Sequence, residues 1–197
     1  MSAVELVGLA ASFSLLAGWR LYACVAIVGL AMRLNLIDAP SNIPALEALA
    51  NPWVIGVAGF GALAELLADK VMWLDSLWDG VHTFIRPAGG ALLALAIVDA
   101  SDPAWQIVAL LLGGGAALLS HGAKAGTRAL VNTSPEPFSN LAVSTVEDVV
   151  TFGGLWLALA YPGIALIVAV ILLALCVALV VVSWRLLAKV RRWMSSG

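Results

Sequence analysis

The chain has 197 residues, of which 62% are hydrophobic and 11% are charged, and its formal net charge is −2. A soluble domain is about half apolar and about a quarter charged, and a small fold could not bury this much apolar surface. The composition therefore excludes an ordinary soluble domain, and the lack of a basic tract in the sequence argues against nucleic acid as a partner. Long Leu-, Ala- and Val-rich runs without the alternation of barrel strands predict an all-α integral membrane protein with about six transmembrane helices.

The first apolar run, residues 6–32, has Arg20 at its centre and is too long for one upright span. Two interpretations fit: one tilted helix, or two half-elements broken or re-entrant at residues 17–19, which we favour slightly. Glu5 precedes the run and no Lys or Arg does, which argues against a cleaved secretory signal. We therefore expect a retained first span.

Five further spans follow in the chain. Four of them are long enough to cross about 30 Å of hydrocarbon: residues 52–73, 105–124, 138–161 and 164–184. Residues 84–98 form a shorter fifth span, which could reach across the bilayer by recruiting residues 80–83. Pro162 and Gly163 predict a turn between the last two spans.

The Lys and Arg residues near the span ends are unevenly distributed. With six spans, eight of them fall on one side: Lys70, Arg86, Lys124, Arg128, Arg185, Lys189, Arg191 and Arg192. The other side holds Arg33 with the acids Asp38, Glu47, Asp99 and Asp102. Since cytoplasmic loops carry the excess of Lys and Arg, we expect one transmembrane domain over residues 1–197 with both termini, including the basic tail 185–197, in the cytoplasm.

A short motif recurs in the two halves of the chain. Residues 17–20, reading AGWR, resemble residues 125–128, reading AGTR, and each copy precedes a span that contains an acid. The acids are Glu65 with Asp69 in the first half and Glu147 in the second. Two three-helix halves, about 1–100 and about 103–190, would then be inverted repeats with breaks at Gly18 and Gly126, a plan found in many transporters. Coincidence in an Ala- and Gly-rich chain is the alternative.

Five charged residues lie within or near the end of apolar spans: Arg20, Glu65, Asp69, Glu147 and Asp148. Three unpaired charges at the membrane centre would cost on the order of 8–10 kcal/mol, which is comparable to the stability of a whole protein. These groups must therefore pair, lose their charge or face water. The functional interpretation is an ion or substrate pathway in which the acids couple protons or ions, and the structural one is a buried ion pair that fixes helix register.

Residues 73–87 contain Asp75, Asp79 and His82 at positions i, i+4 and i+7, so a helix would place them on one face. Two carboxylates and an imidazole could bind a divalent metal. An amphipathic helix at the membrane surface, with its acids in water, is the alternative that we prefer.

Residues 120–140 place Lys124 and Arg128 on one helical face, followed by a proline-containing polar loop with Asn132 and Ser134. With Arg20, these residues form a candidate site for a phosphate or carboxylate. A basic anchor followed by a cytoplasmic turn explains the same pattern. The sequence contains no G-x-S-x-G, H-E-x-x-H or C-x-x-C motif, so apart from the metal no cofactor is indicated.

Two stretches carry a resemblance to a known family: ELLADKVMWLDSLWDGVHTFIRPAGGAL, residues 65–92, and HGAKAGTRALVNTSPEPFSN, residues 121–140. With the acidic pair that follows, they resemble a family of bacterial membrane proteins known as a domain of unknown function. The likeness runs from Gly18 to the basic tail and rests on A-D-K, D-S-x-W-D, T-F-I-R-P and S-P-E-P-F-S-N in that order. It implies a multi-pass protein of the bacterial inner membrane and implies no activity.

Three functions are consistent with the sequence. The first is a small transporter or permease for an anionic or phosphate-bearing substrate, coupled to protons. The second is a membrane-embedded, metal-dependent enzyme at the cytoplasmic face, and the third is a non-catalytic assembly or lipid-organising protein. Membrane lipids are the expected partners, and a homo-oligomer is compatible with each function.

Overall fold

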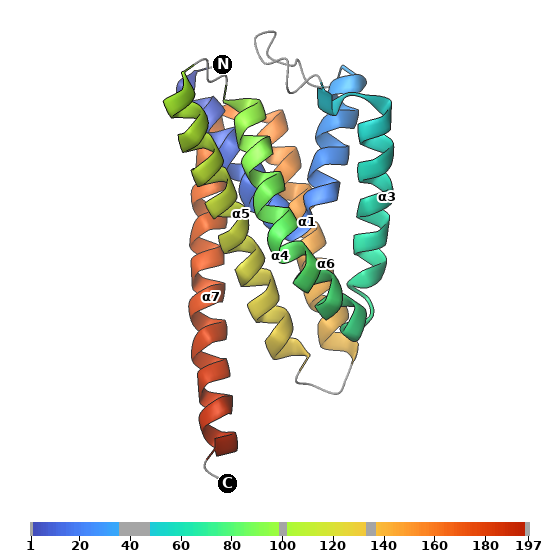
Figure 1. Cartoon of the computed structure of the whole chain (residues 1–197), viewed down its shortest axis with the longest axis vertical. Helices are drawn as coiled ribbons and strands as arrows, with labels where there is room; N and C mark the ends of the chain where they lie inside the picture. Colours follow the sequence, from blue (N-terminus) through green and yellow to red (C-terminus); the bar gives the residue numbers. More distant parts are fainter. Residues whose placement is uncertain (1, 36–47, 99–101, 133–136, 196–197) are drawn as a thin grey trace.

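The computed structural model describes residues 2–35, 48–98, 102–132 and 137–195, and this part of the chain is entirely helical (Figure 1). Within these ranges lie six α-helices: α1 (Ala3–Arg33), α3 (Pro52–Ala68), α4 (Met72–Ile97), α5 (Pro103–Val131), α6 (Pro137–Ala160) and α7 (Ala165–Ser195), with a short 3₁₀ helix, η1 (Pro162–Ile164), before α7. The predicted all-α class and the count of about six helices are confirmed. Both Cys24 and Cys176 are buried and unpaired, as small apolar side chains would be.

Residues typical of helix starts begin three of these helices. Ser2 and Glu5 form a capping box at the start of α1, in which Ser2 N donates to Glu5 Oε2 at 2.7 Å. Asn51 and Asp102 cap α3 and α5, each followed by a proline at the first helical position. Local sequence thus fixes these helix starts before any packing is considered.

The surface of the bundle is apolar where helices face outward. Many large hydrophobic side chains are exposed, and examples from different helices are Trp53, Phe60, Leu111 and Ile171. Charged side chains gather inside, which inverts the pattern of a soluble protein. Five helices have the length and hydropathy of membrane spans, and α3, with 17 residues, is a shorter apolar helix. The structure therefore has the character of a multi-pass membrane protein.

Helix α1 turns back on itself. Arg20 has φ −141° and ψ 70°, so the helix consists of two arms, residues 3–19 and 21–33. The first arm lies beside the start of α7, where Ser12 Oγ donates to Ala165 O at 2.9 Å. The second arm ends beside the start of α3, where Arg33 donates to Ala50 O at 3.4 Å. Both arms reach the same end of the bundle in Figure 1, so α1 is re-entrant.

This turn corrects the expected topology. The interpretation of a broken first run is right, although the break lies at Arg20 and not at residues 17–19. Because α1 returns to the end where it began, only α3, α4, α5, α6 and α7 run from one end of the bundle to the other, and Figure 1 shows the two termini at opposite ends. This arrangement favours termini on opposite sides, whereas the sequence predicted that both share one side.

Two predicted boundaries are also wrong. Helix α4 begins at Met72, so residues 73–83 belong to a 26-residue spanning helix and not to a separate surface helix. Pro87 lies inside α4 and removes one helical donor without ending the helix. Helix α5 continues to Val131 and passes Gly126 without a break, so the bend in α1 has no counterpart there. The inverted repeat stays a prediction.

Helices α4 and α5 pack closely through small residues. A Cβ atom added to Gly113 would clash with Ala94 Cβ and with the carbonyl oxygen of Gly90. Small residues let helix backbones approach in this way inside membranes. Gly113 therefore permits the close approach of α4 and α5, whereas a Cβ atom on Gly115 would meet open space.

Candidate functional site

The buried charged side chains form one connected group, here called the charge network. Its members come from α1, α3, α4, α5, α6 and the link between α3 and α4: Arg20, Glu65, Asp69, Asp75, Asp79, Arg86, Lys124, Arg128, Glu147 and Asp148. All of them except Asp148 are buried. The network includes the start of α4 and the end of α5, which lie at the end of the bundle opposite the N-terminus (Figure 1).

Asp69, directly after α3, is the centre of the network. Its Oδ2 atom lies 2.5 Å from Arg20 Nη1, 3.0 Å from Lys124 Nζ and 3.4 Å from Arg128 Nη2. Burial alone would raise the pKa of Asp69, but the three cations outweigh it and hold that pKa below its ordinary value. Asp69 is therefore an ionised carboxylate enclosed by a three-cation cradle made of Arg20, Lys124 and Arg128.

Arg128 also binds α6. Its Nε and Nη2 atoms donate to the two carboxylate oxygens of Glu147 at 3.2 and 2.7 Å, which is the bidentate geometry that guanidinium groups favour. The Nη1 atom donates to Asn140 Oδ1 at 2.5 Å. Asn140 in turn donates to the backbone oxygen of Asp69 at 2.9 Å. Helices α5 and α6 are thus joined to the α3–α4 link by charged and amide groups.

Arg86 is the second centre. It lies 2.6 Å from Glu65 Oε1 and 2.8 Å from Asp79 Oδ1, and it donates to His121 Nδ1 at 2.6 Å. An arginine can only donate, so His121 Nδ1 must be an acceptor and the ring proton sits on Nε2. That nitrogen then donates to Thr83 Oγ1 at 3.0 Å. The contacts of Arg86 therefore require a neutral His121 of one tautomer.

The turn of α1 reaches into the network. Arg20 itself bridges Asp69 to Asp148 on α6, 2.7 Å away. Trp19 directly precedes the break, and Lys124 Nζ lies 3.4 Å from its carbonyl oxygen. The negative end of the first arm thus faces a cation, as the helix dipole favours. Irregular backbone is tolerated at membrane depth when protein buries it, and Arg20 is only 1% exposed.

The network approaches the surface between the α3–α4 link and α6. Lys70, 38% exposed, donates to Ser144 Oγ at 2.9 Å and lies 3.9 Å from Asp148, which is 19% exposed. Asp148 connects to the buried part through Arg20. A chain of charged groups therefore leads from the surface to the three-cation cradle.

The structure brings together most of the residues predicted as a site. Arg20, Lys124 and Arg128 converge on Asp69, while Glu65, Glu147 and Asp148 belong to the same network. Asn132 lies apart at the end of α5, where its side chain is 3.4 Å from Ser76 Oγ, and Ser134 lies outside the described residues. Arg86, expected near a span end, is instead a buried hub. In the sequence Arg86 follows Asp79 by seven residues, and positions i and i+7 share a helix face. This spacing could have predicted that the two side chains pair.

The candidate metal triad of Asp75, Asp79 and His82 is not assembled. His82 Nδ1 donates to Trp78 O at 2.7 Å, and its Nε2 lies 3.1 Å from the Tyr22 hydroxyl, so both ring nitrogens are occupied. Asp79 turns instead to Arg86. Among the described residues, no group of three or more His, Cys, Asp or Glu side chains is arranged to hold a metal ion.

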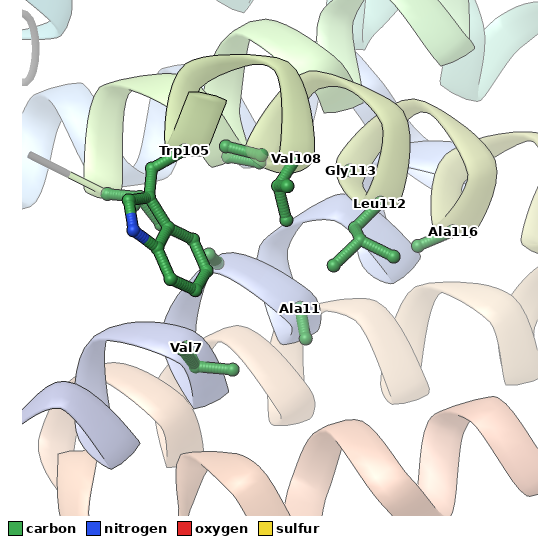
Figure 2. A pocket seen from close by; sticks show the side chains of 11 residues that line it. Val7, Ala11, Trp105, Val108, Leu112, Gly113 and Ala116 are labelled. Carbon is green, nitrogen blue, oxygen red and sulfur yellow. The ribbon is translucent and has the colours of Figure 1, made fainter. Parts of the chain in front are cut away.

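Two cavities described by the structure are apolar and lie away from the charged side chains of the network. Figure 2 shows one of about 140 Å³ between the first arm of α1 and α5, lined by residues such as Val7, Trp105 and Leu112. The other, of about 640 Å³, is an open groove between the second arm of α1, α3 and α4, with Tyr22 and Trp53 in its lining. Their linings suit hydrocarbon and not a charged ligand.

The fold and the network together define a multi-pass membrane protein with an extensively charged interior. The chain belongs to the family described as Domain of unknown function (DUF4126), whose model matches residues 7–182. Neither a curated protein nor a solved structure matches the chain. The expected resemblance is confirmed at the level of the family.

Proposed function

We propose that the protein is a small membrane transporter or permease that moves a small anion coupled to protons, and that the charge network is its transport site. One observation carries the proposal. Four buried cations and five buried acids, contributed by five helices and a link, meet in one network at the turn of a re-entrant helix.

Stability alone does not account for so many buried charges. At about 2.5–3.5 kcal/mol each for insertion at the membrane centre, nine such groups would cost roughly 20–30 kcal/mol if left unpaired. Pairing recovers this cost, but well-packed apolar side chains often stabilise a fold as well as a buried ion pair does. Ionisable groups inside a membrane protein are therefore taken as a functional site by default.

The three-cation cradle supports an anionic substrate. Arg20, Lys124 and Arg128 converge on one carboxylate, so their positions already satisfy an oxyanion. A carboxylate or phosphate from outside could occupy the same place once Asp69 withdraws. Asp69 lies in the short link between α3 and α4, where backbone torsions can change without breaking either helix.

The re-entrant α1 supports transport. Discontinuous helices whose ends face the substrate or the coupling ion are a recurring feature of transporters. In α1 the break lies within the charge network, and Trp19 O faces Lys124. The proposal uses this single break and does not depend on the inverted repeat.

The positions of the Lys and Arg residues support one membrane orientation. Lys70, Arg185, Lys189 and Arg192 belong to elements at the C-terminal end of the bundle, whereas Arg33 ends the second arm of α1 at the opposite end. The excess of Lys and Arg lies on the cytoplasmic side. We therefore propose a bacterial inner-membrane protein with its C-terminus in the cytoplasm and Ser2 on the other side.

The proposal is tested by uptake into proteoliposomes that contain the full chain. Radiolabelled inorganic phosphate and succinate are the two probes, and uptake is measured with and without an inward proton gradient. We expect gradient-dependent uptake of at least one probe, and a loss of about tenfold or more in Arg128→Gln, since one hydrogen bond to a charged group contributes about 1.5–3 kcal/mol. The exposed Arg33→Gln variant is the matched control. Uptake of neither probe by folded wild-type protein would contradict the proposal.

A second candidate, a non-catalytic assembly protein, is favoured by a different observation. Each buried cation of the network already has an acid within 3.0 Å, which a purely structural lock would require. In that case Arg128→Gln and Glu147→Gln would unfold the protein, and the wild type would transport nothing. Thermal unfolding of the same variants therefore separates the two candidates.

A further inference from the structure

The buried part of the charge network has one more acid than it has cations. Its buried cations are Arg20, Arg86, Lys124 and Arg128, and its buried acids are Glu65, Asp69, Asp75, Asp79 and Glu147. The partly exposed pair Lys70 and Asp148 adds no net charge. With every group ionised, the network formed by the described residues would carry one excess negative charge inside a membrane protein.

Asp75 is the acid without a counterion. Each of the other acids in the network, including Asp148, has a cation nitrogen within 2.8 Å. The nearest cation atom to Asp75 is Arg128 Nε at 4.0 Å, and that atom already donates to Glu147. Asp75 is fully buried, and neither of its carboxylate oxygens has a hydrogen-bond partner within the described part of the chain.

An unpaired carboxylate is the costliest state for such a site, because burial removes its hydration and no partner replaces it. A proton removes the charge and leaves only an unsatisfied polar group, which is a much smaller penalty. We propose that Asp75 is the proton-carrying acid of the network and is neutral in the arrangement described here. This inference rests on the proposed function for its role in transport, although the protonation itself does not.

The neighbours of Asp75 show how its proton could be released. Arg128 and Lys124 face it from α5, Asp69 from the α3–α4 link and Asp79 from the next turn of α4. Glu147 on α6 competes for Arg128. When the O–H bond of Asp75 breaks and the proton passes to water, Arg128 can close the 4.0 Å gap and bind the new carboxylate. The same movement weakens its hold on Glu147 and Asp69, which couples the proton to the cradle.

The geometry moves the predicted coupling role away from Glu65 and Glu147. Glu65 is bound to Arg86 at 2.6 Å, and Glu147 is bound to Arg128 through both oxygens. Each of these two carboxylates already has a cation partner, whereas neither oxygen of Asp75 has a hydrogen-bond partner among the described residues. Asp75 was singled out by sequence only as a metal ligand.

Infrared spectroscopy of the purified full chain in nanodiscs tests this assignment. A protonated carboxyl group in an apolar site gives a separate C=O stretch that shifts in D₂O. We expect this band in the wild type at neutral pH, its complete loss in Asp75→Asn and a shift in Asp75→Glu. Asp79→Asn and Glu147→Gln are the matched controls, because both acids have counterions, and both should retain the band.

Several outcomes would overturn the proposal. They are the absence of a protonated-carboxyl band in folded wild-type protein, retention of the band in Asp75→Asn, or its loss on addition of Na⁺, which would assign the site to a metal cation. If Asp75→Asn does not fold, the shift in Asp75→Glu decides. The band can be present in a protein that transports nothing, so failure of this inference and failure of the proposed function are distinguishable.

Discussion

Replacing Asp69 by Asn tests the energetics of the charge network most sharply. The substitution preserves the size of the side chain and removes the charge that three cations share. Arg20 would keep Asp148 at 2.7 Å, and Arg128 would keep Glu147 at 2.7 Å. Lys124 would lose its only contact within 3.0 Å and retain acids at 3.7 and 3.9 Å. The cost therefore falls mainly on Lys124.

Breaking a buried ion pair on one side costs about 3–5 kcal/mol, because a charge remains without a partner. We expect Asp69→Asn to lower the free energy of unfolding by this amount, measured by denaturant titration of the purified protein in detergent. Adding Lys124→Met should recover part of the loss, with a coupling energy of about 0.5–3 kcal/mol. A loss below about 1 kcal/mol, the value typical of an exposed pair, would refute the reasoning.

Three further predictions follow from the structure. Cysteines introduced at Ser2 and Arg192, in a background without Cys24 and Cys176, should react with a membrane-impermeant reagent from opposite sides of the membrane, and labelling from the same side would restore the six-span topology. Gly113→Val should destabilise the protein by about 1–3 kcal/mol through overpacking. Gly115→Val, whose side chain would meet open space, should change the free energy of unfolding by no more than about 0.5 kcal/mol. Equal costs for the two variants would contradict the close approach of α4 and α5. The folded pKa of Asp69 lies below its ordinary value of 3.8, so its contribution to stability is present above that pH and is lost as the pH falls through the folded pKa. Thermal unfolding should therefore show a smaller acid-induced loss of stability in Asp69→Asn than in the wild type. Parallel losses in the two proteins would contradict this role of Asp69.

The sequence was sufficient to predict the class of the protein and most of its helices. Apolar runs of span length reflect the physical demand of the bilayer, which acts on each segment independently. Capping residues such as Ser2, Asn51 and Asp102 mark helix starts for equally local reasons. The excessive length of the first apolar run correctly favoured a break, although the break lies at Arg20 and not at residues 17–19.

The direction of the chain after that break could not be predicted. Whether a broken helix continues across or returns depends on its neighbours, here α3 beside the second arm and α7 beside the first. The number of helices that run from end to end, and with it the end of the bundle at which the N-terminus lies, depends on this single choice. The distribution of Lys and Arg could not show whether α1 crosses or returns, because both arrangements leave the Lys- and Arg-rich ends of the later helices in the same place.

The members of the site were predicted better than their pairing. Arg20, Glu65, Asp69 and Glu147 stood out because a charge in an apolar run is costly. The partner of each is a property of packing between helices, so neither the central place of Asp69 nor that of Arg86 was visible. Asp75 is the clearest case, because its significance lies in the absence of a counterion.

Displacement of Asp69 from the three-cation cradle can be measured directly by pulsed electron paramagnetic resonance. Spin labels at the exposed positions Leu67 on α3 and Val149 on α6 report the distance across the cradle in nanodiscs. The distance distribution should shift when inorganic phosphate or succinate is added at mildly acidic pH, while a control pair at Leu111 and Ile171 stays unchanged. A distance distribution that neither anion nor acid alters would show that Asp69 stays bound to its three cations, and it would contradict displacement of Asp69 by a substrate anion.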